Sequence, residues 1–190
     1  GKMLFGAIMA VIVTDITGSP LAGMLGAMIS TSIVAWLVGL IMIKLHAQQV
    51  IVGIGLNFLM QGLTTVLLAV LWGNPGNSIE VPRLSGNATD ILTGIPVIGG
   101  LFDMQTPILL IAFAIVIGVS LWMFRTKSGL RLRSIGENPA AADCLGLPVH
   151  RYRLVACILG GMFCGLAGAD LSIGQLGYFA KNMTSGRGYI

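Results

Sequence analysis

Long runs without a charged residue restrict the fold of this chain more than any other feature. Asp, Glu, Lys and Arg are all absent from Ile16–Ile43 and from His46–Trp72. Each run is long enough to cross a bilayer, which takes about 20 apolar residues. Of the 190 residues, 55% are hydrophobic and 9% are charged, whereas a soluble domain has about 25% charged residues. Because a core of this size cannot hide so much apolar surface, we predict an integral membrane protein.

Shorter apolar runs predict further membrane helices. Ile108–Phe124 is near the lower length limit for a span, Leu154–Ala169 is also free of charge, and Met3–Thr14 is expected to be the remnant of a longer span. Together the runs predict an all-α, polytopic helical bundle in which residues 1–190 form one transmembrane domain. The chain does not start with methionine and an apolar run resumes near its end. We therefore expect a fragment of a longer protein.

Two polar segments separate these runs and set the topology. Residues 73–105 are rich in Gly, Pro, Asn and Asp, which predicts an exposed loop. If the chain begins inside, this loop is external and the basic segment 125–153 is cytoplasmic. Eight of the eleven Lys and Arg residues then lie on the inner side: Lys2, Lys44, Arg125, Lys127, Arg131, Arg133, Arg151 and Arg153. This satisfies the positive-inside rule, so the net charge of +4 reflects topology and does not indicate nucleic-acid binding. Lys181 and Arg187 fall outside this pattern.

The basic segment contains a very short helix with well-defined ends, in the sequence GENPAAADCLGLP. Asn138 is a good N-cap, Pro139 suits the first helical position, and Gly146 suits the left-handed position after the last turn. Isolated helices shorter than about 12 residues are marginal in water, so another structure must hold this one. Anionic lipid, the chain's own bundle and a soluble partner are the alternatives. The small side chains favour docking into a cleft.

Small residues recur every fourth position in two of the runs. Ala22, Gly26 and Ser30 form one series, and Gly161, Gly165 and Ala169 form the other. Such series allow helices to approach closely in a bilayer. We interpret them as packing surfaces.

Polar residues inside the runs are candidates for a substrate pathway, because burial of polar groups in lipid costs free energy. Asn57 and Gln61 lie four residues apart, on one face of a helix. They either contact substrate or form a hydrogen bond between helices. Gln175 and Asn182 are placed at an outer gate. Asp170 either faces an outer cavity or pairs with Lys181.

The sequence RTKSGLRLRSIGENPAAADCLGLPVHRYRL resembles the cytoplasmic loop of permease subunits of bacterial ABC importers. The nearest group is the simple-sugar and nucleoside permeases, which are related to ribose and branched-chain amino-acid permeases. MLFGA, QQVIVGIGLNFL and NMTSGRGYI agree with this group. The resemblance spans nearly the whole chain. Members of the family are longer at both ends.

The resemblance implies that residues 138–146 are a coupling helix, which sits in a cleft on an ATP-hydrolysing subunit. The family pattern is Glu-Ala-Ala, three residues and Gly. In this chain Ala140 stands in place of the glutamate, and Glu137 lies just upstream. The residues expected to couple to the ATPase are Glu137, Asn138, Pro139, Ala140, Ala141, Ala142, Asp143 and Gly146.

The implied function is that of a transmembrane subunit of an ATP-driven importer. It would move nucleosides or simple sugars across the bacterial cytoplasmic membrane by alternating access, as a multi-pass protein and not an enzyme. The expected partners are cytoplasmic ABC ATPase subunits that carry ATP and Mg, a second permease subunit, an external substrate-binding protein and the lipid bilayer. No cofactor or metal is expected on this chain. The alternatives are an ion-coupled secondary carrier or channel, or a membrane scaffold that recruits a cytoplasmic protein.

Overall fold

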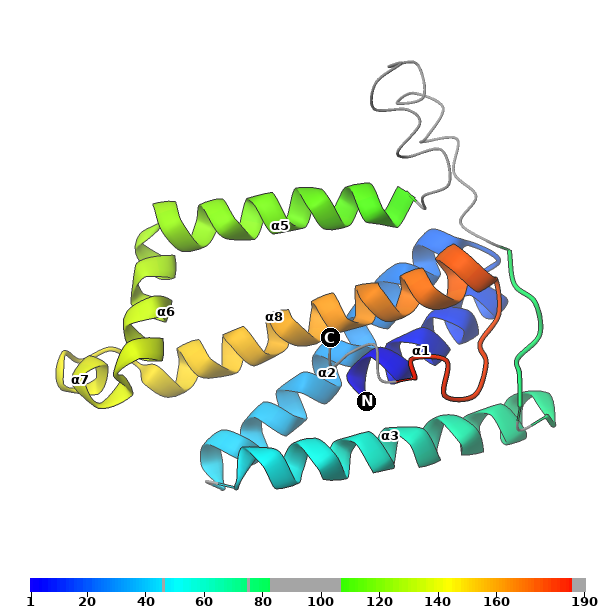
Figure 1. Cartoon of the computed structure of the whole chain (residues 1–190), viewed down its shortest axis with the longest axis horizontal. Coiled ribbons are helices and arrows are strands. Elements are labelled where there is room, and N and C mark those ends of the chain that lie inside the picture. Colours follow the sequence, from blue (N-terminus) through cyan, green and yellow to red (C-terminus); the bar gives the residue numbers. More distant parts are fainter. Residues whose placement is uncertain (46, 75, 83–106, 186–190) are drawn as a thin grey trace, which may run out of the picture.

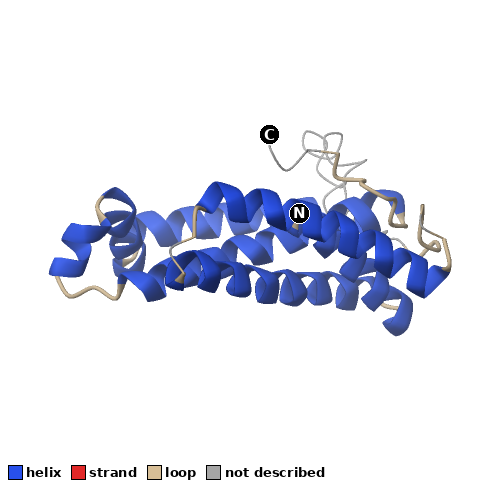
Figure 2. Cartoon of the chain, turned by 90° about the horizontal axis from the view of Figure 1, so that it is seen from below, coloured by secondary structure: helices blue, strands red, loops and turns tan. Residues whose placement is uncertain are grey.

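The computed structural model describes residues 1–45, 47–74, 76–82 and 107–185, and every regular element in these ranges is helical (Figures 1 and 2). The elements are α1 (Lys2–Thr17), α2 (Pro20–Lys44), α3 (Gln49–Trp72), α5 (Pro107–Arg125), α6 (Lys127–Glu137), α7 (Pro139–Cys144), α8 (Val149–Ala169) and the π-helix η1 (Asp170–Leu176). The predicted all-α bundle is confirmed. Most of the predicted external loop, residues 83–106, lies outside the described residues.

Three helices in the described part of the chain are long and apolar enough to cross a membrane. They are α2, α3 and the continuous helix formed by α8 and η1. A fourth candidate is α5 taken together with α6, although the two are bent by 80° at Thr126. Several predicted boundaries differ from the observed ones, and the last span continues past Ala169 to Leu176. Ile16 belongs to α1, and α8 begins at Val149, so the basic segment 125–153 is largely helical and not a plain loop.

Helices α1, α2 and α8 form the tight centre of the bundle (Figure 1). Glycines on α8 bring the backbones together. A Cβ added to Gly165 would lie 2.6 Å from the carbonyl oxygen of Ala27 on α2, and a Cβ added to Gly6 on α1 would lie 2.9 Å from the Cα of Gly165. The predicted small-residue surface on α8 is therefore a packing surface within the chain.

The residues of α2 that face α8 are not the predicted series of small residues but the next position in each repeat. Ala27, Thr31 and Ala35 are fully buried and face α8. Gly26, which belongs to the predicted series, faces α1 instead: an added Cβ would lie 2.7 Å from a methyl carbon of Val13. Helix α2 thus has two adjacent faces of small residues, one for each neighbour.

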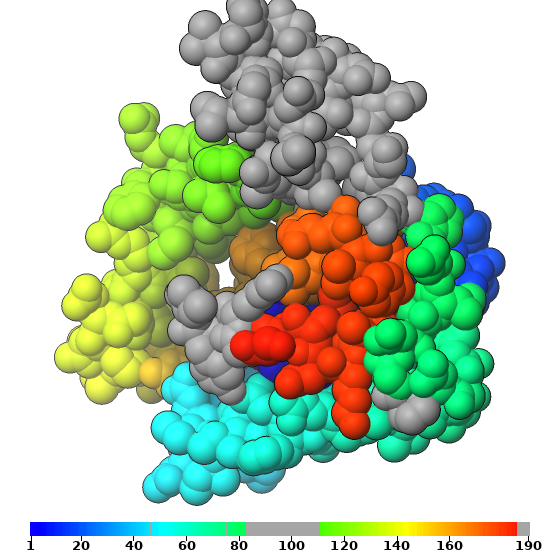
Figure 3. Space-filling view, turned by 45° about the vertical axis from the view of Figure 1, so that its right-hand side comes forward, coloured from blue at the N-terminus to red at the C-terminus, as the bar shows by residue number. Residues whose placement is uncertain are grey.

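The C-terminal segment after η1 packs on the segment that follows α3 (Figure 3). The Ser78 N–H donates to the carbonyl of Phe179, and the Val81 N–H donates to the carbonyl of Gly177, both at 2.8 Å. Phe179 is fully buried and belongs to a cluster with Leu4 and Leu68. These contacts fix the C-terminal segment beside α1 and α3.

Helix α5 is packed more loosely. It lies beside α8 (Figure 1), yet a groove of about 560 Å³ separates the two helices, with Trp122 and Met123 on one side and Leu159 and Phe163 on the other. The bundle therefore has a close-packed centre of α1, α2 and α8 and a looser periphery.

Candidate functional site

The short helix α7 has a well-defined N-terminus. The Asn138 side-chain oxygen accepts hydrogen bonds from the backbone N–H groups of Ala140 and Ala141, both at 3.1 Å. The backbone N–H of Asn138 donates to the carbonyl of Ser134 and closes α6. Pro139 occupies the first helical position, where no N–H is needed. Asn138 thus ends one helix and begins the next, and its predicted role as N-cap is confirmed.

The C-terminus of α7 is equally well defined. Gly146 has a φ of 76°, in the left-handed region that glycine adopts without strain. The Gly146 N–H donates to the carbonyl of Asp143 at 2.9 Å, and the Leu147 N–H donates to the carbonyl of Ala142 at 3.2 Å. These are the two hydrogen bonds of a Schellman motif. The predicted helix end is confirmed.

One face of α7 packs on its own chain. Ala142 is 2% exposed and forms a buried cluster with Ile135 of α6 and Val149 of α8, against which Leu147 and Tyr152 also pack. The bundle therefore supports this short helix from one side. Ala142 is one of the residues expected to couple to the ATPase, and its side chain faces inward and forms the base of α7.

The other face of α7 is exposed. Ala140, Ala141, Asp143 and Cys144 are accessible, and the side chain of Leu145 is 80% exposed. Glu137, the last residue of α6, is exposed as well. We call Ala140, Ala141, Asp143, Cys144 and Leu145 the outer face of α7. It presents small side chains, one carboxylate and one large apolar group. Helix α7 itself lies at one end of the bundle (Figure 1).

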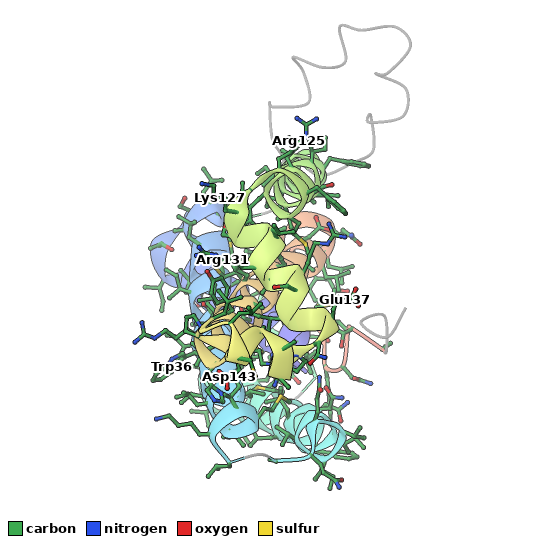
Figure 4. All side chains as sticks on the ribbon, turned by 90° about the vertical axis from the view of Figure 1, so that its left-hand side faces the viewer. Trp36, Arg125, Lys127, Arg131, Glu137 and Asp143 are labelled. Carbon is green, nitrogen blue, oxygen red and sulfur yellow. The ribbon has the colours of Figure 1, made fainter. Side chains whose placement is uncertain are left out.

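Basic residues lie on α5, α6 and α8, the elements that flank α7 in the chain. Figure 4 views this end of the bundle and shows Arg125, Lys127, Arg131 and Glu137 along the end of α5 and α6, with Asp143 on α7. Arg131 donates to the Tyr152 hydroxyl at 3.5 Å, and the guanidinium of Arg133 lies 4.6 Å from the centre of the Phe124 ring. Arg131 and Arg133 therefore each contact an aromatic side chain at this end of the bundle.

Sequence analysis did not predict helix α6. Its N-cap is Thr126, whose hydroxyl accepts from the Gly129 N–H at 3.2 Å. Gly129 is needed at the bend, because an added Cβ would lie 2.5 Å from the carbonyl oxygens of Trp122 and Met123. A threonine N-cap followed by a glycine three residues later was the available signal. The four basic residues nearby favoured a loop instead.

A second cluster of polar residues lies between α3 and the C-terminal segment. Gln61, Thr64 and Thr65 of α3 line a pocket of about 160 Å³ with Lys181 and Asn182. The Gln61 amide nitrogen donates to the Asn182 side-chain oxygen at 3.4 Å. The pocket thus joins two residues that were predicted separately, one for the pathway and one for the gate. It also contains Lys181, which the topology left unexplained; Arg187 lies outside the described residues.

The other two predicted pathway residues lie elsewhere. Asn57 lines a separate pocket of about 670 Å³, together with Lys2 and Gln49. Lys2 therefore lies beside α3, in a pocket that Met42 of α2 also lines. Gln175 donates to the Asp170 carboxylate at 3.0 Å. Gln175 and Asn182, predicted to border one gate, are thus in different environments.

Comparisons with known proteins agree with this architecture. The whole chain, residues 1–190, matches the family described as branched-chain amino acid transport system / permease component. A nucleoside ABC transporter permease protein of Lactococcus lactis subsp. cremoris is 34% identical over 203 residues, which cover 100% of this chain and 62% of the relative. No solved structure matches significantly.

Two further relatives point to the same kind of protein. A guanosine ABC transporter permease protein of Bacillus subtilis is 29% identical over 199 residues, covering 100% of this chain and 62% of the relative. A glucose ABC transporter permease protein of Haloferax volcanii is 28% identical over 204 residues, which cover 100% of this chain and 52% of the relative. The chain therefore spans less than two thirds of the length of each relative. With its membrane-spanning helices, it is a multi-pass protein of the cytoplasmic membrane and belongs to the permease-component family of ABC transport systems.

Proposed function

We propose that this chain is part of the transmembrane subunit of an ATP-driven importer for nucleosides or simple sugars. The outer face of α7 carries the proposal. A helix with both ends fixed, one side packed on its own bundle and the other side exposed is suited to transmit force from a partner. The partner would be a cytoplasmic ABC ATPase, which holds ATP and Mg and performs the hydrolysis. This chain supplies the lever and not the catalytic groups.

The orientation follows from the same end of the molecule. Arg125, Lys127, Arg131 and Arg133 lie close to α7 in the chain, and the positive-inside rule places such a segment in the cytoplasm. A second permease subunit and an external substrate-binding protein would complete the transporter. Substrate would then enter at the end opposite α7.

The pocket around Gln61 is our candidate for part of the substrate route. Gln61 lies midway along α3, and hence near the middle of a span. Amide, hydroxyl and ammonium groups in this pocket match the hydroxyls and ring nitrogens of a nucleoside or sugar. The Gln61–Asn182 hydrogen bond at 3.4 Å is long, so an incoming hydroxyl can replace it at little cost.

Uptake by cells tests the energy source. Cells that carry the full-length gene as their sole copy would be given labelled guanosine or labelled glucose, in separate assays. We expect uptake of one of them to stop when ATP is depleted and to continue when ion gradients are collapsed by ionophores at constant ATP. Uptake that stops with the gradients while ATP is maintained would establish the ion-coupled carrier instead.

The same assay tests the pocket. Gln61→Ala combined with Asn182→Ala removes two groups that bind substrate in this proposal. At about 0.5–1.5 kcal/mol for each hydrogen bond, we expect the KM for uptake to rise roughly tenfold or more, with an unchanged amount of protein in the membrane. Gln48→Ala is the control, because this exposed glutamine lies between α2 and α3 and away from the pocket. An unchanged KM in the double variant removes the pocket from the route.

A further inference from the structure

A groove at the basic end of the bundle is separate from both sites described so far. It lies between the end of α2 and the start of α8, and its volume is about 630 Å³. Ligand sites have volumes of about 300–1,000 Å³. Three basic side chains line the groove, Lys44, His150 and Arg151, and all three are exposed. No Asp or Glu is among the described residues that line it.

The rest of the groove is aliphatic. Leu40 and Ile43 come from α2, and Leu154 and Val155 come from α8. Lys44 is the last residue of α2, and Leu40 precedes it by one helical turn. Arg151 lies in the first turn of α8, so Leu154 and Val155 lie one turn further along the helix. The charged part therefore lies at the ends of two membrane spans, and the aliphatic part lies about 5 Å deeper in the membrane.

We propose that this groove binds one anionic phospholipid. Lys44 and Arg151 hold the phosphate, His150 donates a further hydrogen bond, and an acyl chain lies along Leu40, Ile43, Leu154 and Val155. Because no carboxylate is among the described residues that line the groove, Lys44 and Arg151 select an anionic headgroup over a zwitterionic one, which brings its own positive charge. The aliphatic part selects a lipid over a free phosphate. This proposal uses the orientation proposed above only to assign the lipid to a leaflet, which is the inner one.

Lipid titration of the full-length protein tests this site. The purified protein in mild detergent would be titrated with phosphatidylglycerol or phosphatidylcholine, and native mass spectrometry would count the lipids bound to each protein. We expect one phosphatidylglycerol to be retained in preference to phosphatidylcholine. Since a Lys or Arg near the membrane surface contributes about fivefold in affinity, Lys44→Gln combined with Arg151→Gln should weaken this binding about 25-fold.

A matched variant separates the groove from general surface charge. Arg125→Gln combined with Lys127→Gln removes the same number of charges at the same end of the bundle, and neither residue lines the groove. We expect this variant to bind phosphatidylglycerol as the wild type does. The proposal would be overturned if the two double variants lost the same affinity for phosphatidylglycerol. It would also be overturned if the wild type retained both lipids equally. Displacement of phosphatidylglycerol by glycerol 3-phosphate would overturn it as well, because the aliphatic part would then contribute nothing.

Photo-crosslinking in a bilayer gives a second test without a variant. The full-length protein would be placed in vesicles of phosphatidylcholine that contain phosphatidylglycerol with a photoactivatable acyl chain. We expect crosslinks on the peptides that contain Leu40–Lys44 and His150–Val155. Crosslinks confined to other helices would contradict the proposal, since they would mean that protein covers the groove. Neither readout depends on transport, so these results stand apart from the uptake assay.

Discussion

Two surfaces of small residues in this molecule have different surroundings. On α8, Gly161 and Gly165 are buried against α2. On α7, Ala140 and Ala141 are exposed, and only Ala142 is covered. Small residues indicate that another backbone comes close, but they do not say whether it belongs to the same chain. The surface on α8 has its partner in this chain, whereas we propose that the surface on α7 has its partner in the ATPase.

The largest expected effect comes from a bulky residue in the buried surface. Gly165→Leu would place carbon atoms against the carbonyl of Ala27, which is backbone and cannot move aside without shifting α2. We expect a loss of about 3 kcal/mol or more and little monodisperse protein after detergent extraction. Gly160→Leu is the matched control on the same helix, since an added Cβ there meets nothing within 4 Å. Similar yields of the two variants would mean that α2 and α8 are not packed as described.

Adjacent alanines on α7 should differ in their tolerance of a large charged side chain. Ala142→Arg forces a guanidinium into the cluster of Ile135 and Val149, which we expect to destabilise the attachment of α7 by about 1–3 kcal/mol. Ala141→Arg adds the same side chain on the outer face and should leave this attachment unchanged. Hydrogen exchange of the amides at 142–147 measures the difference. Equal protection in both variants would show that the cluster does not hold α7.

A smaller effect is expected from the N-cap. Asn138→Ala removes the acceptor for two backbone N–H groups and should cost about 1 kcal/mol. Exchange at Ala140 and Ala141 should then be roughly fivefold faster, with the packing of α1, α2 and α8 unaffected. Thr126→Ala is the comparison, because it uncaps α6. If Thr126→Ala speeds exchange in α7 as much as Asn138→Ala does, the two helices move as one unit and the local capping argument is wrong.

Local features were predictable from the sequence, and contacts between distant segments were not. The ends of α7 could be predicted because Asn138, Pro139 and Gly146 act on their immediate neighbours. The predicted series on α2 differs by one residue from the face that contacts α8, because small residues occur on two adjacent faces of that helix. The contact between Gln61 and Asn182 joins segments 121 residues apart. No periodicity in either segment indicates this contact.

The central claim is that the outer face of α7 docks on an ATPase subunit. The most direct measurement is to produce the full-length protein together with the products of its neighbouring genes, to purify it in mild detergent, and to identify the co-eluting proteins by mass spectrometry. Three forms would be compared: the wild type, Ala141→Arg on the outer face, and Gln48→Arg, which adds the same charge to the loop between α2 and α3. We predict that an ABC ATPase elutes with the wild type and with Gln48→Arg and is lost from Ala141→Arg. An ATPase retained equally by all three forms, with α7 folded in each, would contradict the claim.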